Sequence, residues 1–209
     1  MNPIVQCENL GRCYGTGDTS FYAVEGVTLA IAEREFLSLS GPSGSGKTTL
    51  LNLLSGLDTP TAGQVTLAGQ RLDALDRNAL ADLRLRRIGF VFQAYNLIPV
   101  LSARENVEFI MQIQGVPAKR RRRQAEAMLE EVGLGGLSGR RPGQLSGGQQ
   151  QRVAIARAMA SAPAILFADE PSANLDSAAT DGLLALMRRL NGDRGMTFCI
   201  ASHDPRVID

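Results

Sequence analysis

Short apolar runs alternate along this chain with longer segments of helical periodicity. Each run has the length of a buried strand. The runs span residues 36–40, 65–68, 88–92, 164–168 and 197–201. A glycine-rich turn follows the first run, and the residues after it, 47–57, are expected to form a helix. This alternation predicts an α/β core with a strand–loop–helix unit near its beginning.

The pattern becomes helical between residues 93 and 161. Ser102 is followed three residues later by Glu105, a capping-box pattern that predicts a helix N-terminus. A second helix is expected over residues 118–132, and the glycine-rich run 133–148 is expected to be a loop that leads into a third helix.

Length and charge limit the architecture and the partners. The 209 residues suit one domain that carries a subdomain. We therefore predict an α/β core, residues 1–92 and 162–209, with an inserted helical subdomain, residues 93–161. The net charge of +1, from 22 Lys and Arg against 21 Asp and Glu, gives no global attraction to nucleic acid or anionic membranes.

No segment has the roughly 18 uninterrupted apolar residues of a spanning helix. The best candidate, residues 153–168, is broken by Arg157 and Pro163, and the N-terminus lacks the features of a signal peptide. We therefore expect a cytoplasmic protein. Its three cysteines lack a metal-binding spacing and are expected to be free thiols. They are Cys7, Cys13 and Cys199.

A phosphate-loop pattern lies between the first predicted strand and the following helix. Its residues are Gly41, Pro42, Ser43, Gly44, Ser45, Gly46, Lys47 and Thr48. Glycines let backbone N–H groups converge on phosphate oxygens, and the helix N-terminus adds a positive dipole end. Lys47 can neutralise the outer phosphates, and the Thr48 hydroxyl can bind Mg²⁺. The alternative, an ordinary turn with a solvated lysine, is disfavoured by the order of strand, loop and helix.

Two carboxylates follow the predicted strand at 164–168. Asp169 is suited to hold Mg²⁺, and Glu170 can polarise a water for attack on a γ-phosphate. Both should lie at the carboxyl edge of the sheet, where ligands of open α/β sheets bind. Solvated charges at a strand end are the alternative, which the phosphate loop upstream disfavours. The only histidine, His203, should emerge at the same edge, although a lone histidine is more often structural.

Residues 145–149, Leu-Ser-Gly-Gly-Gln, and the helix expected after them resemble the signature motif of ABC ATPases. Tyr14 then matches the aromatic that stacks on adenine, Gln93 the glutamine of the lobe-joining loop, and His203 the switch histidine that contacts the γ-phosphate. The further nucleotide-binding residues that the resemblance implies are Thr49, Ser146, Gly147, Gly148, Gln149 and Asp176. The implied catalytic residues are Lys47, Gln93, Glu170 and His203, and the implied Mg²⁺ ligands are Thr48, Gln93 and Asp169.

The resemblance implies a RecA-like phosphate-loop NTPase core with N-terminal antiparallel β elements and an inserted helical subdomain. In such proteins the signature residues complete the ATP site of a second copy, so two ATP molecules are buried in a head-to-tail dimer. Residues 56–63 and 88–99 resemble the lipoprotein-releasing and macrolide-exporter branch. This implies an ATP-hydrolysing subunit on the inner face of the cytoplasmic membrane that drives a separate permease. Family members generally continue past the switch histidine into a helix and a strand pair, so the sequence is expected to be truncated or to have lost that edge.

Two alternatives remain at this level. Soluble ABC ATPases of DNA repair, chromosome organisation or translation share the motifs, but they carry coiled coils, zinc modules or tandem cassettes that do not fit in 209 residues. The basic run at residues 119–123 is the one feature that favours nucleic acid, and a solvated helix start is the simpler interpretation. A regulatory ATPase that gates a permease without moving substrate would have the same motifs.

Overall fold

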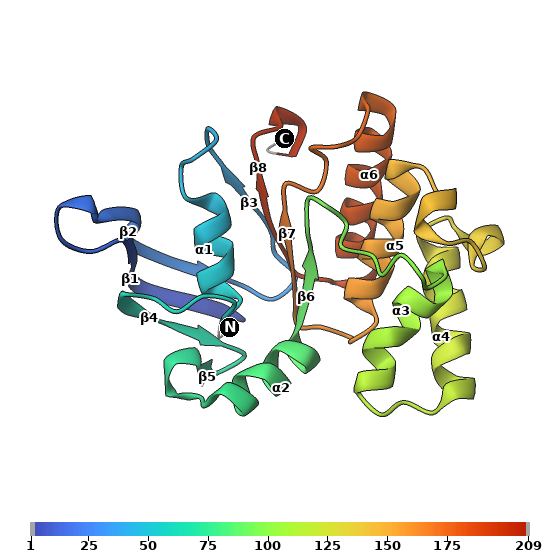
Figure 1. Cartoon of the computed structure of the whole chain (residues 1–209), viewed down its shortest axis with the longest axis horizontal. Coiled ribbons are helices and arrows are strands. Elements are labelled where there is room, and N and C mark those ends of the chain that lie inside the picture. Colours follow the sequence, from blue (N-terminus) through green and yellow to red (C-terminus); the bar gives the residue numbers. More distant parts are fainter. Residues whose placement is uncertain (1–2, 208–209) are drawn as a thin grey trace.

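The computed structural model of the chain describes residues 3–207, which form two sheets and a helical layer (Figure 1). The strands are β1 (Val5–Tyr14), β2 (Phe21–Ile31), β3 (Phe36–Ser40), β4 (Ala62–Leu67), β5 (Gln70–Arg71), β6 (Ile88–Val91), β7 (Ile165–Asp169) and β8 (Phe198–Ser202). The helices are α1 (Lys47–Leu54), α2 (Arg77–Arg87), α3 (Ala103–Ile113), α4 (Ala118–Glu131), α5 (Gly147–Met159) and α6 (Ser177–Arg194).

The two sheets differ in strand direction. One is antiparallel, with the order β2-β1-β4-β5, and the other is parallel, with the order β3-β8-β7-β6. Because the strands of the second sheet all run the same way, their carboxyl ends meet at one edge. The segments that follow β3, β6, β7 and β8 therefore converge there, which brings distant parts of the sequence together.

Side-chain alternation along the parallel strands produces the layers. On β7, Ile165 and Phe167 pack in the hydrophobic cluster shared with α1 and the antiparallel sheet. Their neighbours Leu166 and Ala168 pack in a second cluster with α5 and α6. A strand places successive side chains on opposite faces, so a continuous apolar run serves a strand that is covered on both sides. The parallel sheet is thus the middle layer of three.

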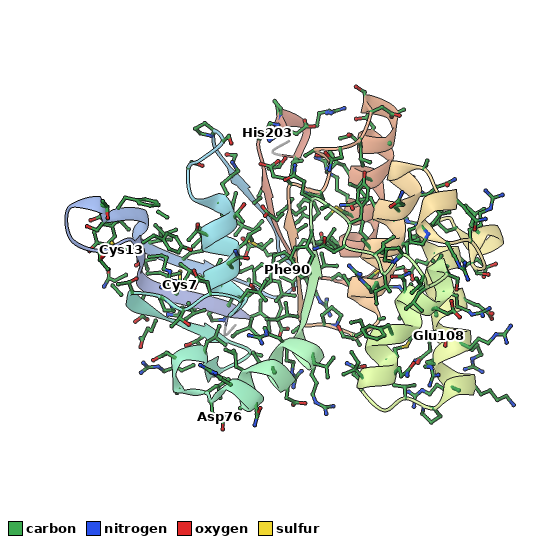
Figure 2. The ribbon with its side chains drawn as sticks, viewed as in Figure 1. Cys7, Cys13, Asp76, Phe90, Glu108 and His203 are labelled. Carbon is green, nitrogen blue, oxygen red and sulfur yellow. The ribbon has the colours of Figure 1, made fainter. Side chains whose placement is uncertain are left out.

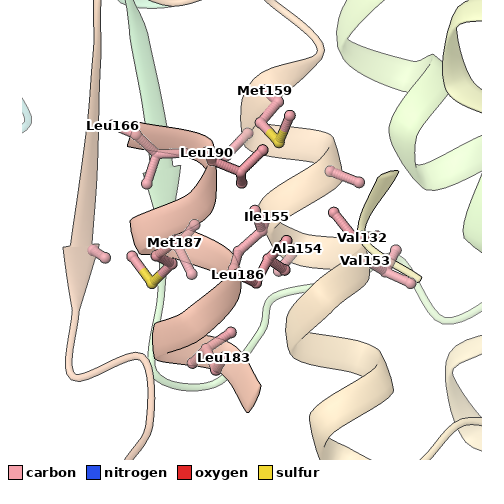
Figure 3. Close-up of a cluster of buried hydrophobic side chains, with 14 of the residues drawn as sticks. Val132, Val153, Ala154, Ile155, Met159, Leu166, Leu183, Leu186, Met187 and Leu190 are labelled. Atoms are coloured by element: carbon pink, nitrogen blue, oxygen red, sulfur yellow. The ribbon is translucent and has the colours of Figure 1, made fainter. Parts of the chain in front are cut away.

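Helices α5 and α6 form the layer against the second face of the parallel sheet (Figure 3). Ile155 of α5 and Leu186 and Leu190 of α6 are buried, and Leu166 of β7 lies in the same cluster. Helix α5 also contacts α3, α4 and β6. It is therefore the helix through which the helical part of the chain is joined to the sheet.

A buried asparagine holds part of the connection from β6 to α3. Asn106 of α3 is fully buried, and its Oδ1 accepts a hydrogen bond from the backbone N–H of Ile98 at 2.8 Å. Its Nδ2 donates to the carbonyl oxygens of Ile98 and Leu101. At the start of α3, the predicted capping box between Ser102 and Glu105 is present. These contacts fix the end of the connection that leads into α3.

Several boundaries differ from the sequence predictions. The helix that begins at Lys47 ends at Leu54 rather than at residue 57, because Gly56 takes a left-handed conformation (φ 66°) that ends the helix. Strand β4 begins at Ala62, three residues before the predicted run. The basic run lies in α4, where Arg121 pairs at 3.2 Å with Glu108, which is labelled in Figure 2. Lys119 is exposed.

Cys7, Cys13 and Cys199 are free thiols, as predicted. Cys7 and Cys13 lie on β1 (Figure 2). Burial raises the pKa of the Cys199 thiol to about 12, with a smaller contribution from the charge of Glu35. Such a thiol stays protonated and unreactive at neutral pH. Within residues 3–207, no helix has both the length and the apolar character needed to cross a membrane.

Candidate nucleotide site

The phosphate loop connects β3 to α1, as the sequence predicts. Gly46 is the N-cap residue of α1 and has φ 88°, and Gly44 has φ 81°. A Cβ atom at Gly46 would lie 2.1 Å from the carbonyl oxygen of Ala23, so only glycine fits there. The Nζ of Lys47 donates hydrogen bonds to the carbonyl oxygens of Gly41 at 2.7 Å and Pro42 at 3.0 Å. The lysine therefore lies folded over its own loop.

Asp169 ends β7 beside the first turn of α1. The Thr48 hydroxyl donates a hydrogen bond to Asp169 Oδ1 at 3.0 Å. Burial raises the pKa of Asp169 and the charge of Glu170 adds to this, while the Thr48 hydrogen bond and the charge of Lys47 oppose the shift. A carboxylate in such surroundings is stabilised by a bound cation. The structure thus brings together two of the three predicted Mg²⁺ ligands.

Glu170 has a backbone conformation that is rare for a residue other than glycine (φ 45°). Its Oε2 lies 2.8 Å from Nδ1 of His203, which follows β8 (Figure 2). Its Oε1 lies 3.6 Å from Nζ of Lys47. The unusual backbone therefore directs the carboxylate between the phosphate loop and the lone histidine, which confirms that His203 emerges at this edge of the sheet.

A cleft of about 550 Å³ extends from the phosphate loop to the antiparallel sheet. This volume lies in the range of small-molecule sites. The residues that line it are Tyr14, Phe21, Tyr22, Ala23, Ser43, Gly44, Ser45, Gly46, Lys47, Thr48, Thr49, Gln93 and Glu170. The predicted adenine-stacking residue Tyr14 is thus at the cleft, but so are Phe21 and Tyr22, which are both more than half exposed.

The signature residues lie away from this cleft. Ser146 is the N-cap residue of α5, and none of residues 145–149 is among those that line the cleft. Ser146, Gly148 and Gln149 instead line a surface hollow of about 290 Å³ that also includes Ala179. Asp176, the N-cap residue of α6, accepts a hydrogen bond from Ala179 N at 2.7 Å. The signature residues and Asp176 are therefore neighbours, and their contact with nucleotide across a dimer remains a prediction.

Two polar residues near the site have roles that the sequence pattern did not reveal. Arg157 of α5 donates hydrogen bonds to the carbonyl oxygens of Tyr95 and Asn96, just after Gln93. Burial lowers its pKa. Asn174 donates from Nδ2 to the carbonyl oxygen of Gln93 at 3.1 Å. The sequence did contain a signal for the role of Arg157, which is the only charged residue in the apolar run 153–168. A charge in such a run is expected to be buried, and a buried charge needs fixed partners.

Comparisons with known proteins agree with this geometry. Residues 24–173 match the ABC transporter family. The lipoprotein-releasing system ATP-binding protein LolD of Anaeromyxobacter dehalogenans is 48% identical over 208 residues, which cover 99% of this chain and 87% of that protein. The macrolide export ATP-binding/permease protein MacB of Hyphomonas neptunium is 44% identical over 98% of this chain, and the match spans only 32% of that protein.

A solved structure of the ATP-binding cassette MJ0796 superimposes with a TM-score of 0.89 at 42% identity, covering 97% of this chain and 89% of that one. It is described as a dimeric post-hydrolysis state bound to ADP and Pi. The fold class and the family resemblance expected from the sequence are thereby confirmed. This chain belongs to the ABC transporter family, as one of its ATP-binding and ATP-hydrolysing subunits.

Proposed function

We propose that this subunit drives a membrane permease carried on a separate polypeptide, in a system that exports or releases a lipoprotein, peptide or drug. The observation that carries the ATPase part is the convergence of Lys47, Thr48, Asp169, Glu170 and His203 at one sheet edge. The LolD relative, matched over nearly its whole length, supports a separate permease. A soluble role in DNA repair or translation, or a purely gating role, is not favoured.

Nucleotide binding follows from the cleft. The loop amides and Lys47 receive the phosphates once Nζ leaves the carbonyl oxygens of Gly41 and Pro42. Tyr14 receives the adenine base, because it lies at the cleft with its hydroxyl hydrogen-bonded to Asp58, whereas Phe21 and Tyr22 are more than half exposed. The subunit acts at the inner face of the cytoplasmic membrane, where ATP is available to it.

The residues around Asp169 fit Mg²⁺, which prefers hard oxygen ligands. Thr48 offers a hydroxyl oxygen and Asp169 a carboxylate that burial destabilises, and Gln93 lines the same cleft with its amide. When bound, the ion would neutralise charge on the β- and γ-phosphates.

Glu170 is the group best placed to act on the attacking water. Its carboxylate accepts the proton as the water oxygen bonds to the γ-phosphorus, and the bond from phosphorus to the ADP oxygen breaks. His203 holds the carboxylate in this direction through the 2.8 Å contact to Oε2 and is free to contact the γ-phosphate with Nε2. The products are ADP and phosphate.

The signature residues suit a second copy of the chain. The α5 N-terminus at Ser146 is an anion-binding element that its own cleft does not use. A head-to-tail dimer would place it against the γ-phosphate held by the partner, so that ATP joins the two copies and hydrolysis separates them.

We assign to the permease a groove of about 460 Å³ that is lined by residues of α2, β6, α3 and α5. It has apolar walls from the sheet side, including Ile88 and Phe90, and from the helical side, including Ile98 and Ile110. Phe109, which also lines it, is 39% exposed. An apolar groove of this kind suits a short helix of a partner.

The groove is mechanically connected to the nucleotide cleft. Arg157 lines the groove and also holds the carbonyl oxygens of Tyr95 and Asn96, in the loop that begins with Gln93. A partner segment that shifts Arg157 would therefore move Gln93 relative to the phosphates. This gives the permease a route to control hydrolysis.

Co-purification from membranes tests this assignment. The double variant Leu57→Glu/Phe109→Glu places two charges in the groove and should lose the permease that accompanies the parent protein. The double variant Ala30→Glu/Ala127→Glu changes two exposed positions outside the groove and should retain it. Equal recovery of the permease with both variants would remove the groove from the interface, and absence of any permease with the parent would argue against the transporter role.

A further inference from the structure

The hydroxyl group of Tyr14 is anchored outside the nucleotide cleft. It donates a hydrogen bond to Oδ2 of Asp58 at 2.7 Å, across 44 residues of sequence. Oδ1 of the same carboxylate pairs with the Nη2 of Arg12 at 2.8 Å. The Arg12 guanidinium lies over the Tyr14 ring, 4.7 Å from its centroid. Three side chains therefore contact one another pairwise, and the tyrosine is one of the three.

This arrangement holds Tyr14 through residues that do not line the cleft. Tyr14 lines the cleft, whereas Arg12 and Asp58 do not. Arg12 thus covers the ring away from the nucleotide site, and Phe21 lies beside it at 5.9 Å between centroids. A phenol ring with its hydroxyl and one face both held has little freedom to rotate, so stacking on its other face would need little further ordering.

Asp58 is suited to this anchoring because it stays ionised. Burial would raise its pKa, but hydrogen bonds from Tyr14 and from Thr59 N, together with the charge of Arg12, lower it overall. A carboxylate that accepts from a phenol forms a charge-assisted hydrogen bond, which is stronger than a bond between neutral groups. Arg12 is held through Nη2, while its Nε is buried without a hydrogen-bond partner among the described residues.

The anchor also joins the two ends of the nucleotide site. Asp58 follows α1, and its backbone N–H donates to the carbonyl oxygen of Asn52 in the last turns of that helix. The opposite end of α1 carries Lys47 and the phosphate loop. One short helix therefore links the base-binding ring to the phosphate-binding loop.

We infer that Asp58 and Arg12 are positioning residues that fix the Tyr14 ring for the adenine base and so strengthen nucleotide binding without contacting the nucleotide. The inference rests on the proposed stacking role of Tyr14. It predicts an effect confined to ligands that carry a base, because the phosphate loop does not depend on the orientation of this ring.

Calorimetric titration with MgADP and with magnesium pyrophosphate separates the two parts of the site. Tyr14→Ala should weaken MgADP binding about tenfold, as expected for loss of one base–aromatic stack. Tyr14→Phe removes one hydrogen bond and should weaken MgADP binding about threefold to fivefold, and Asp58→Ala, which also removes the partner of Arg12, should weaken it at least as much. The double variant Tyr14→Phe/Asp58→Ala should bind MgADP no more weakly than Asp58→Ala alone, since the hydrogen bond between Tyr14 and Asp58 is already lost there. Pyrophosphate affinity should stay within about twofold throughout, which also reports an intact phosphate loop.

Two further variants sharpen the test. Asp58→Asn keeps an oxygen acceptor for the Tyr14 hydroxyl and should recover part of the MgADP affinity. Asp73→Ala is the matched control, because it breaks a comparable surface pair, Arg71–Asp73, in the same part of the chain and should change neither affinity. If Tyr14→Ala leaves MgADP binding unchanged, Tyr14 does not stack on the base, and both the proposed stacking role and the inference are overturned. If Tyr14→Ala weakens MgADP but Asp58→Ala does not, or if Asp58→Ala weakens pyrophosphate equally, the inference alone is overturned.

Discussion

Two helix N-termini of this chain are candidates for binding the same γ-phosphate, and they are built differently. At α1 the N-cap residue is Gly46, no side chain caps the helix, and Lys47 stands in the first turn. At α5 the N-cap residue is Ser146, whose hydroxyl accepts from Gln149 N at 3.3 Å, while Gln149 Oε1 accepts from Ser146 N at 3.0 Å. The first helix end leaves its backbone donors open, and the second satisfies part of them within its own chain.

This difference predicts that the first helix end binds phosphate by itself and that the second does not. Unpaired N–H groups at a helix N-terminus attract anions, and a lysine in the same turn adds a full charge. The α5 end satisfies part of its donors within its own chain and has no cation in its first turn. We therefore expect α5 to bind phosphate only together with a site that already holds it, as a closing element of a dimer.

The largest effect should come from removing Lys47, the cation at the uncapped N-terminus of α1. Lys47→Ala should abolish measurable ATP hydrolysis, a loss of about a thousandfold or more, and should strongly weaken MgATP binding, because a charge on the outer phosphates is left unpaired. Steady-state phosphate release and a nucleotide titration measure the two effects. Arg123→Ala removes an exposed cation of α4 and should hydrolyse ATP at the parent rate. Near-normal turnover of Lys47→Ala would disprove the assignment of this cleft.

The second effect concerns the capped helix end. Glu170→Gln should bind MgATP but hydrolyse it about a hundredfold more slowly, because the amide is not a base. In this background MgATP should convert monomer to dimer, as light scattering would show. Adding Ser146→Arg should prevent the dimer while MgATP affinity of the monomer changes less than about twofold, since residue 146 is not at its own cleft.

The exposed site Ala127 supplies the control, because Ala127→Arg adds the same side chain on α4 and should leave the dimer intact. A dimer that survives Ser146→Arg would contradict a role for α5 across the interface. If Glu170→Gln hydrolyses ATP at the parent rate, Glu170 is not the base, and His203 is the nearest other candidate.

The two helix ends also differ in how far the sequence revealed them. The phosphate loop and the capping box at Ser102 depend on residues within a few positions of one another, so spacing alone predicted both. The buried strands β7 and β8 were found within one residue, because a strand covered on both faces is a continuous apolar run. The roles of the signature residues came only from resemblance.

Other features of the structure could not be predicted from local sequence patterns. Helix α6 was not predicted, and α2 was missed because Leu83 is its only buried residue. The contact of Tyr14 with Asp58 joins positions far apart in sequence, and no local pattern reports it. The left-handed backbone of Glu170 depends on the surrounding fold rather than on its own side chain.

The smallest predicted effect measures the cap itself. Ser146→Ala should lower the free energy of unfolding by about 0.5 kcal/mol and Ser102→Ala by about 1–2 kcal/mol, both in urea titrations. The two boxes have the same pattern, but Ser102 is buried and its hydroxyl also donates to Glu105 Oε2 at 2.7 Å, whereas Ser146 is exposed. Ser177→Ala, at the first residue of α6 where no side-chain bond is lost, should be near neutral. If Ser146→Ala costs as much as Ser102→Ala, the α5 cap serves the stability of the monomer, and its hydroxyl is less free to turn toward a phosphate held by the partner subunit.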